Sequence, residues 1–559
     1  MPIASAIRSL IAELKRNHVR DMLLLPVTMP FAIRRFVQDR PSPAQARTQL
    51  QQALATRNQR FLELARSRVF AEPESPYKKL LDHAGCKFGD LEASLQRLGL
   101  EATLKSLAAE GVYLMPAEYK GRKTVTRGSL SFRVRPRDLM GRQNRGSSAG
   151  IVRSSGSTGR PSSSVASFDW WREVTPALAP FLETHGLTNS KMAAYEPVVG
   201  SLGAIAIVMM AMRLGVPADR FFIRPTTMNS RLESLFFGLT FHEMAFVARC
   251  FGLGSARPET APADQLDRIV DWVEQNRRRN QTTCIRTVAS NAARIARVAD
   301  SMGASLEGCT FIASGEPMTP AKRHAVEKVG GAVAVTWGYF PINTIALGCG
   351  RPVHDDDMHV IRQCMAVIEH PEPITLTNGD TVRPLLFTTL YPSAAQLEIN
   401  VSNGDQGVLS ENDCGCPMHA AGLTLRVHNV GSFEKLTSEG LAFSIDELYA
   451  LLESTLPERF GGGAGDYQLL EEEDEGGQSR LTLLVDPSVG ALDDATVLDF
   501  LTTVLAEGSR QNGFMTNVWR DAGTLRVHRQ APQTSARGKI LPLRLSGKAS
   551  AARNTAGTM

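Results

Sequence analysis

The segment of the chain whose residue types best suit anion binding is Ser-Ser-Gly-Ser-Thr-Gly at residues 154–159. Glycine lets backbone amides approach a ligand closely, and serine and threonine hydroxyls add hydrogen-bond donors. The segment is not a Walker loop, because Arg160 and Pro161 follow it where that motif has Lys and then Ser or Thr. Taken alone, it fits a surface loop or linker equally well. The candidate phosphate ligands are Ser154, Ser155, Gly156, Ser157, Thr158 and Gly159.

Four segments stand in a fixed order along the chain, and together they are more specific than any one of them. The first is SSGSTGRPS, which begins at Ser154, and the second is FIASGEP, which ends with Gly315, Glu316 and Pro317 and is followed by the aromatic-Gly pair Trp337-Gly338. The third is EINVSNGDQG, which contains Asp405, and the fourth is TSARGKILP, which contains Lys539. In order and spacing they resemble the signatures of the adenylate-forming superfamily, which includes acyl-CoA synthetases, luciferases and peptide-synthetase adenylation domains. SPYKKLLDHAG (residues 75–85), DCGCP (residues 413–417) and Ser162 in place of a loop lysine resemble its phenylacetate-CoA ligase branch.

The resemblance implies a two-step reaction. A carboxylate attacks the α-phosphate of ATP, pyrophosphate leaves, and the acyl-adenylate passes to a thiol or another nucleophile. It further implies that residues 154–159 hold the β- and γ-phosphates and that Asp405 accepts hydrogen bonds from ribose. Lys539 would neutralise charge developing on the reacting oxygens, an effect worth about 3 kcal/mol in comparable sites. The implied adenine and ribose contacts are Gly315, Glu316, Pro317, Trp337, Gly338 and Asp405, and the implied hinge residues are Glu434 and Lys435.

Two departures from the family pattern bear on activity. Pro341 stands where the family has a glutamate that helps hold Mg²⁺, and Ser432 follows Gly431 where an arginine is usual. Either Mg²⁺ is held by ATP phosphates, water and another residue, which its reluctance to dehydrate permits, or the protein has drifted from acyl activation. Arg426 is a second candidate for the ribose contact. Because Lys539, Asp405 and the phosphate segment are all present, we favour retained activity.

The expected function is ATP-dependent activation of a small or aromatic carboxylic acid, with ATP and Mg²⁺ as cofactors and coenzyme A as co-substrate. The acid's pocket is expected between Tyr195–Gly200 and Trp337. Three alternatives remain open. The acyl group passes to an acyl or peptidyl carrier protein or an amine, the enzyme adenylates an inorganic acid such as nitrite, or the chain is a catalytically silent nucleotide-binding or assembly protein.

Composition narrows the choice of partners. The 62 Lys and Arg against 57 Asp and Glu give a net charge of +5, too small to predict a nucleic-acid partner. The basic stretch 120–145 would suit an anionic substrate, but a solvated loop is the simpler interpretation. No uncharged apolar run is long enough to span a bilayer.

The 8 scattered cysteines are typical of a reduced, cytoplasmic protein. Cys414 and Cys416 alone form a close pair, which is half of a zinc site without a second close pair.

The elements that must position these residues indicate an α/β fold. Residues 1–110 are predicted to be a helical lead-in, because apolar residues recur at helical spacing. Residues 111–430 alternate helical patterns with runs such as CTFIAS and AVAVTW, which predicts a large domain with a mainly parallel sheet and a β subdomain. A hinge is expected at 431–435, and residues 436–559 are expected to form a small mobile α+β lid that carries Lys539.

Overall fold

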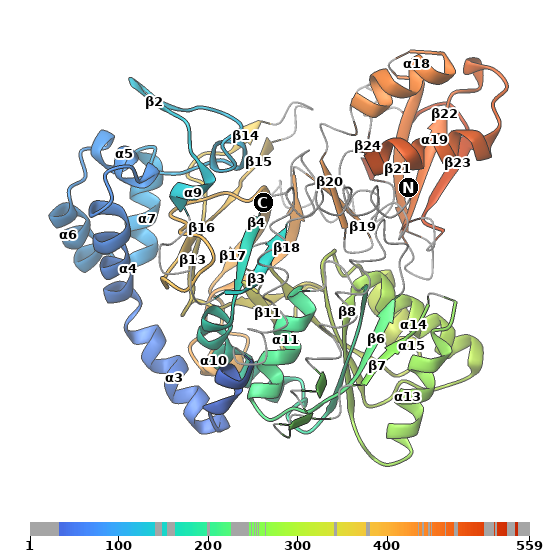
Figure 1. The fold of residues 1–559 in the computed structure, drawn as a ribbon, viewed down its shortest axis with the longest axis horizontal. Coiled ribbons are helices and arrows are strands. Elements are labelled where there is room, and N and C mark those ends of the chain that lie inside the picture. The colour runs from blue at the N-terminus through green and yellow to red at the C-terminus, as the bar shows by residue number, and fades with distance from the viewer. Residues whose placement is uncertain are drawn as a thin grey trace, which may run out of the picture.

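A ten-stranded mixed sheet runs through the larger part of the structure, which is a computed structural model of the chain (Figure 1). The α/β fold class predicted from the sequence is confirmed. Among the described residues, no helix has the length and apolar character needed to cross a membrane. The structure describes residues 33–139, 148–153, 163–197, 202–224, 245–246, 249–250, 252, 254, 257–262, 264–339, 342, 344–375, 381–433, 435–438, 441–444, 448, 450–463, 465–473, 479–507, 519, 523–533 and 543–545.

Helices fill the N-terminal part of the described chain. The first labelled helix, α3, begins with a capping box in which Ser42 Oγ accepts from the amide of Gln45 at 3.2 Å and Gln45 Oε1 accepts from the amide of Ser42 at 2.8 Å. The later helices share a core with strands β13 and β16 of the large domain. The lead-in is therefore packed onto that domain. Its helices are α3 (Pro43–Ala55), α4 (Arg57–Ala65), the π-helical turn η1 (Arg66–Phe70), α5 (Pro76–His83), α6 (Phe88–Leu98) and α7 (Leu100–Ala109).

Six strands of the large sheet are parallel and occupy the order β10-β9-β8-β5-β6-β7. The chain moves outward from β5 through β6 to β7, then returns to the other side of β5 and continues through β8, β9 and β10. The direction of winding thus reverses between β5 and β8. The bounds are β5 (Lys191–Pro197), β6 (Ala218–Arg224), β7 (Arg257–Thr260), β8 (Thr283–Val288), β9 (Cys309–Ser314) and β10 (Ala332–Trp337).

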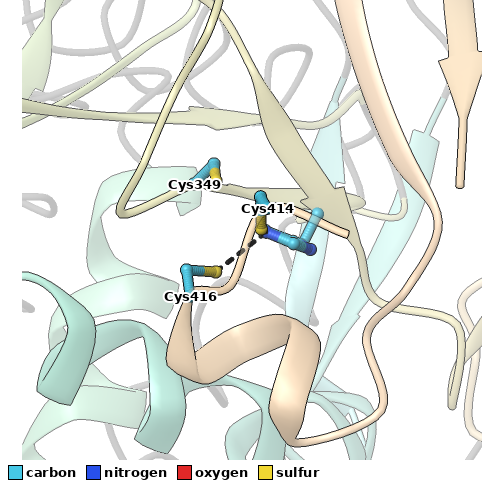
Figure 2. A group of neighbouring side chains, drawn as sticks. Cys349, Cys414 and Cys416 are labelled. Atoms are coloured by element: carbon cyan, nitrogen blue, oxygen red, sulfur yellow. Dashed lines mark hydrogen bonds between the residues drawn. The ribbon is translucent and has the colours of Figure 1, made fainter. Parts of the chain in front are cut away.

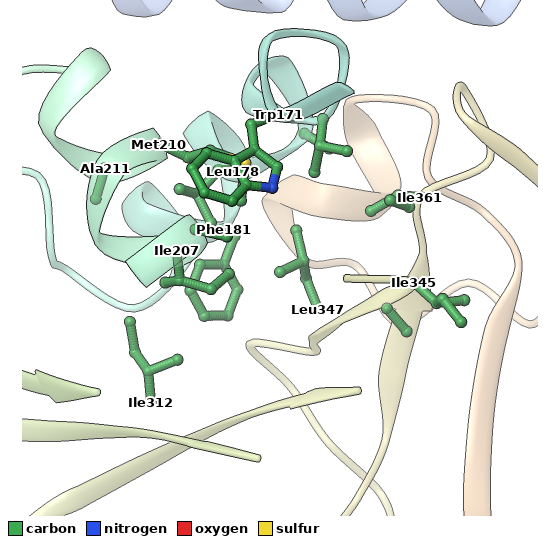
Figure 3. Close-up of a cluster of buried hydrophobic side chains, with 14 of the residues drawn as sticks. Trp171, Leu178, Phe181, Ile207, Met210, Ala211, Ile312, Ile345, Leu347 and Ile361 are labelled. Atoms are coloured by element: carbon green, nitrogen blue, oxygen red, sulfur yellow. The ribbon is translucent and has the colours of Figure 1, made fainter. Parts of the chain in front are cut away.

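Helices cover both faces of the parallel strands, and alternate residues of one strand therefore enter different cores. Met192 and Ala194 of β5 belong to the core beneath α10 and α11, whereas Ala193 and Tyr195 belong to the core beneath α13 and α14. Figure 3 shows the first core, in which Trp171 and Phe181 of α10 lie beside α11. The helices are α10 (Phe168–Thr184), α11 (Leu202–Arg213), α13 (Asp267–Arg277), α14 (Ala289–Met302) and α15 (Pro320–Lys328).

Antiparallel strands extend the sheet beyond β10 in the order β11-β12-β18-β17. Their bounds are β11 (Ala346–Gly348), β12 (Met358–Val360), β17 (Asp405–Ser410) and β18 (Arg426–Ser432), and the short helix α16 (Pro417–Ala420) precedes β18. The predicted β subdomain is present as two further pairs, β13 (Met365–Glu369) with β16 (Leu385–Thr389) and β14 (Ile374–Thr375) with β15 (Thr381–Val382). Nearer the N-terminus lie α8 (Pro116–Tyr119), β1 (Val125–Arg127), β2 (Leu130–Phe132) and α9 (Pro136–Leu139).

The C-terminal residues build a smaller α+β unit with a core of its own. Its four-stranded sheet has the order β23-β22-β21-β24, and Figure 1 shows α19 beside these strands. The hairpin β19–β20 follows β18 in the chain. The elements are β19 (Lys435–Ser438), β20 (Leu441–Ser444), η3 (Leu451–Thr455), α18 (Leu456–Phe460), β21 (Tyr467–Glu473), β22 (Ser479–Val485), η4 (Pro487–Val489), α19 (Asp494–Glu507), β23 (Leu525–Arg529) and β24 (Leu543–Leu545).

Candidate functional site

The carboxyl ends of the parallel strands form the candidate site. In an open sheet with helices on both faces, ligands bind outside these ends where the direction of winding reverses. That reversal lies between β5 and β8. The residues that end β5, β8 and β9 therefore define the centre of the candidate site.

A buried polar cluster stands at this point. Arg286 of β8 lies 3.3 Å from Glu196 of β5, measured from Nη1 to Oε1, and its Nη2 donates to Ser314 Oγ at the end of β9. The two charged side chains are 7% and 12% exposed. Burial raises the pKa of Glu196 to about 7, against the opposing charges of Arg286 and Arg224. Three strands thus contribute to one cluster in which a carboxyl group exchanges its proton near neutral pH.

The predicted Gly-Glu-Pro turn follows β9 directly, and the side chain of its glutamate is bound by other residues of the protein. The Glu316 carboxylate accepts from the amide of Ser290 at 2.7 Å and from its Oγ at 2.8 Å, and Lys322 Nζ lies 3.4 Å away. Ser290 is in the first turn of α14, where a negative charge is favourable. The Glu316 side chain is 1% exposed, whereas Gly315, with a φ of +83°, and Pro317 are exposed. Glu316 therefore fixes the turn, and the exposed backbone on either side of it is what a ligand can meet.

The predicted aromatic-Gly pair ends β10, the parallel neighbour of β9. Trp337 is half-buried, with its ring centroid 5.6 Å from that of Phe387. The structure thus brings residues 315–317 and 337–338 to the carboxyl ends of adjacent strands. Their contact with adenine stays a prediction.

Tyr339, the next residue, donates its hydroxyl to the buried carboxylate of Glu398. Tyr119 donates to the other carboxylate oxygen of Glu398 at 3.0 Å. Burial raises the pKa of Glu398 to about 7, and the two hydroxyl hydrogen bonds act in the opposite direction. Burial, and after it the negative charges of Glu398 and Asp405 among others, raise the pKa of Tyr339 well above its ordinary value. This electrostatic interaction couples the end of β10 to the start of β17.

Asp405 begins β17, and its carboxylate is oriented by its own turn. Asn403 Nδ2 donates to Asp405 Oδ2 at 2.9 Å, and the amide of Asp405 donates to Asn403 Oδ1 at 3.0 Å. The predicted ribose contact stays a prediction. The alternative ribose residue, Arg426, is instead buried and lies 2.8 Å from Asp357, measured from Nη1 to Oδ2, which argues against that role.

Other predicted site residues lie outside the described part of the chain. The phosphate segment Ser154–Gly159 falls between β3 (Ser148–Arg153) and β4 (Ser163–Ser167), which pair as antiparallel strands. Pro341, Glu434 and Lys539 are also outside, while Lys435 is the first residue of β19. Because β18 extends to Ser432, residues 431 and 432 of the predicted hinge segment belong to the large sheet.

Sequence reasoning missed the Glu196–Arg286–Ser314 cluster and the Glu398–tyrosine cluster. Arg286 had a usable signal, since it is the one charged residue within the apolar strand TCIRTV. Part of the basic stretch 120–145 makes internal contacts, so a fully solvated loop does not describe it. Arg127 binds both carboxylate oxygens of Glu118 at 2.9 and 3.0 Å, and Arg135 Nε lies 2.8 Å from Asp138.

Two groups of side chains in the described ranges have ligand atoms close enough together to hold a metal ion. One is Cys349, His359, Cys414 and Cys416, and the other is Asp413, Cys414 and His419. Neither group includes Glu316, Glu398 or Asp405, whose carboxylates are engaged with the neighbours described above.

No protein-family model and no curated protein matches the chain. Solved structures do resemble it. An amide bond synthetase Mcba variant from Marinactinospora thermotolerans is 10% identical, with 94% of this chain and 100% of that chain covered and a TM-score of 0.39. An NRPS protein containing adenylation and PCP domains is 14% identical, with 73% and 60% covered and a TM-score of 0.37. An acyl-CoA synthetase (AMP-forming)/AMP-acid ligase II-like protein from Dyadobacter fermentans is 11% identical, with 72% and 89% covered and a TM-score of 0.25.

The names of two of these structures mention adenylation or AMP formation. With TM-scores below 0.5, the likeness supports no residue role and no activity for this chain.

Proposed function

We propose that this protein is an adenylate-forming ligase that uses ATP to activate a carboxylic acid. The observation that carries the proposal is the position of two nucleotide signatures predicted from the sequence. The segments at 315–317 and 337–338 follow the carboxyl ends of adjacent parallel strands, next to the reversal of winding between β5 and β8. This edge is where an open α/β sheet binds nucleotides.

The proposed reaction has two steps. A carboxylate oxygen of the substrate bonds to the α-phosphorus of ATP, and the bond to the bridging oxygen breaks as pyrophosphate leaves. A thiol sulfur then bonds to the acyl carbon, its proton leaves to solvent, and AMP departs with the oxygen that came from the carboxylate. Lys539 would offset the negative charge that develops on the reacting oxygens in the first step. Residues 154–159 would hold the departing pyrophosphate through amides and hydroxyls.

The acid is assigned to the space between the Tyr195–Gly200 segment and Trp337. The Arg286–Glu196–Ser314 cluster includes one residue of that segment and lies where β5, β8 and β9 end. A guanidinium already paired with a carboxyl group can orient polar groups of a substrate without leaving an unpaired charge when the substrate is absent. We propose a small or aromatic acid as substrate and coenzyme A as the thiol acceptor, with a carrier-protein thiol or an amine as the alternative acceptor.

We assign Mg²⁺ to ATP phosphates, water and a residue other than Glu316 or Glu398. Glu316 is bound to Ser290 and Lys322, and Glu398 to two tyrosines, so these two acids are committed to structural contacts. Magnesium keeps several waters and commonly needs only one or two carboxylates.

Pyrophosphate exchange into ATP, measured against a panel of carboxylic acids and nitrite, tests the first step. We expect acid-dependent exchange that falls by about a hundredfold or more in Lys539→Ala, as with loss of other charge-stabilising groups. Lys328→Ala is the matched control, because Lys328 is an exposed lysine paired with Asp300 on the surface. ATP binding without exchange by any acid would overturn the proposal and favour a silent nucleotide-binding protein. Exchange that survives Lys539→Ala would refute the role given to that lysine.

The acceptor is identified separately with the acid that supports exchange. Coenzyme A, a phosphopantetheinylated carrier protein and simple amines are supplied one at a time, and acyl products are detected by mass spectrometry. A thioester with coenzyme A is the expected product. Acyl transfer only to a carrier or an amine would leave the adenylation step intact and correct the acceptor.

A further inference from the structure

Three cysteines and one histidine from distant parts of the chain meet at the antiparallel side of the large sheet. One ligand atom from each of Cys349, His359, Cys414 and Cys416 lies within 4.8 Å of the other three. Figure 2 shows the sulfur atoms of the three cysteines turned toward a common point. Cys349, His359 and Cys416 are buried, and Cys414 is half-buried. Soft sulfur ligands are thus concentrated in one enclosed spot.

The histidine is oriented as a metal ligand requires. His359 Nδ1 lies 2.5 Å from the carbonyl oxygen of Leu423, and only a protonated nitrogen can donate to a carbonyl. This contact places the proton on Nδ1 and leaves the lone pair on Nε2. His359 Nε2 lies 3.2 Å from Cys416 Sγ and 3.5 Å from Cys414 Sγ. A backbone carbonyl that fixes the tautomer in this way is the usual outer partner of a metal-bound histidine.

Separate elements hold the four residues. Cys349 directly follows β11, His359 is in β12, and Cys416 is the N-cap of α16. The amide of Cys349 donates to the carbonyl of Asp357 at 2.9 Å, and the amide of Arg351 donates to Cys349 Sγ at 3.4 Å. Gly415, with a φ of +65°, makes the turn that lets the cysteines on either side of it face one centre. The backbone therefore presets the arrangement.

We propose that Cys349, His359, Cys414 and Cys416 bind one Zn²⁺ ion in a tetrahedral structural site. Zinc is held at about 2.3 Å by sulfur and about 2.0 Å by nitrogen, so tetrahedral ligands stand about 3.5–3.8 Å apart. The observed Nε2–Sγ distances of 3.2 and 3.5 Å are close to that spacing. Three thiolates with one imidazole form a ligand set that structural zinc sites use. Because four protein ligands complete the tetrahedron, the ion has no open position for a substrate.

The neighbouring group Asp413, Cys414 and His419 does not compete for this assignment. Asp413 is exposed, and its Oδ1 already accepts from the amide of Gly415 at 2.7 Å. That hydrogen bond shapes the turn between the two cysteines. We therefore assign Asp413 to the loop and Cys414 to the Cys₃His site.

The consequence of the site is a crosslink within the fold. Residues 414 and 416 stand 55 and 57 positions beyond His359, and one ion would tie the β11–β12 segment to the connection between β17 and β18. Loss of the ion would free that long connection, and binding releases the thiol protons as the thiolates form. The site is independent of the proposed ligase activity.

Metal analysis of the full-length protein, purified under reducing conditions without chelators, is the test. We expect about one zinc per chain by elemental mass spectrometry, and intense thiolate-to-metal absorption when Co²⁺ replaces Zn²⁺. Cys416→Ser and His359→Ala should each lower the bound zinc at least tenfold. Two control variants should keep the full equivalent, Cys250→Ser at an exposed cysteine and Cys284→Ala at a buried one.

The wild-type measurements do not depend on whether a variant folds. Zinc below about a tenth of an equivalent after reconstitution of the reduced wild-type protein, or Co²⁺ binding without the thiolate band, would overturn the proposal. A disulfide between two of the three thiols in the freshly isolated protein, found by mass mapping, would also overturn it. Equal zinc loss in Cys284→Ala would show that the metal responds to general destabilisation rather than to loss of a ligand.

Discussion

Two buried arginine–carboxylate pairs stand in the same sheet, and they differ in distance and in surroundings. At the antiparallel end, Arg426 and Asp357 lie 2.8 Å apart and are 8% and 2% exposed. At the carboxyl edge of the parallel strands, Arg286 and Glu196 lie 3.3 Å apart, and burial raises the pKa of Glu196 to about 7. The first pair is a close ionic contact deep in the fold, whereas the carboxyl group of the second is near the point of accepting a proton.

The two pairs also differ in the neighbours that they contact. Asp357 also accepts through its carbonyl from the amide of Cys349 and through Oδ2 from the amide of Val353 at 3.2 Å, so it organises the Cys₃His group. Arg286 spans three strand ends at the point of reversed winding, where a ligand is expected. The Arg426–Asp357 pair therefore belongs to the surroundings of the Cys₃His group, whereas the Arg286–Glu196 pair lies where a ligand is expected.

The largest expected effect on stability comes from breaking the Arg426–Asp357 pair. Asp357→Ala leaves the Arg426 guanidinium buried without its carboxylate, which costs about 3–5 kcal/mol in comparable buried pairs. Urea unfolding followed by tryptophan fluorescence measures the loss in the free energy of unfolding. A loss below about 1 kcal/mol would mean that this pair is not the stabilising contact that its 2.8 Å distance indicates.

The second expected effect is a pH dependence carried by Glu196. Its pKa is raised from 4.5 to about 7 in the folded protein, so the folded state binds more protons than the unfolded state between these values. Stability is therefore highest below about pH 4.5 for this group and is lost as the pH rises through 7. The loss is about 3 kcal/mol at most, because one pKa unit corresponds to about 1.4 kcal/mol.

Glu196→Gln removes this titration and keeps the shape of the side chain. Urea unfolding of wild type and variant at pH 5 and pH 8 should show a smaller decrease in the variant. Glu398→Gln is the companion, because burial raises the pKa of Glu398 to about 7 as well. Parallel pH curves for Glu196→Gln and wild type would contradict the assignment of the titration to Glu196.

A smaller effect on stability is expected at the Gly-Glu-Pro turn, which follows β9 near the Arg286–Glu196 pair. Ser290→Ala removes one of the hydrogen bonds to the Glu316 carboxylate, and hydrogen bonds to charged groups contribute about 1.5–3 kcal/mol. Chemical denaturation quantifies the loss, and the KM for ATP should rise because the turn is less well fixed. An unchanged KM together with a loss of stability would confine Glu316 to a structural role.

The smallest effect is expected at an exposed ion pair, which sets the scale for the buried ones. Lys328 Nζ and Asp300 Oδ2 lie 2.7 Å apart with side chains 56% and 47% exposed. Solvent screens such a pair, so Lys328→Ala should change the free energy of unfolding by less than about 1 kcal/mol. A larger change, measured in the same urea series, would show that exposure does not separate strong pairs from weak ones in this protein.

Much of the fold could be predicted from the sequence because it depends on local patterns. The apolar runs CTFIAS and AVAVTW are β9 and β10 with the predicted bounds, since each is a short buried strand bounded by turn residues. The uncharged segment that ends before Arg213 forms helix α11, in which residues 206–212 are buried, and the alternating segment SRLTLLV forms β22 in the C-terminal unit. In each case the hydrophobic pattern that predicts the element and its burial lies within a few residues that are adjacent in the sequence.

The candidate site was harder to predict because its contacts join residues far apart in the chain. Arg286 meets Glu196 across 90 positions, and Tyr119 meets Glu398 across 279. The sequence does not reveal the Cys₃His group for the same reason, since only Cys414 and Cys416 are close in sequence. Cys349 and His359 join them because β11 and β12 lie side by side in the sheet. The spacing of residues along the sequence does not reveal which strands pair in the sheet.

The most direct test of acyl-adenylate formation follows an oxygen atom. The acid that supports pyrophosphate exchange is labelled with oxygen-18 in its carboxylate and turned over with ATP and the identified acceptor, and the released AMP is weighed by mass spectrometry. Attack of the carboxylate on the α-phosphorus predicts one oxygen-18 atom in AMP and none in pyrophosphate. Unlabelled AMP, or label found in inorganic phosphate beside ADP, would contradict the account.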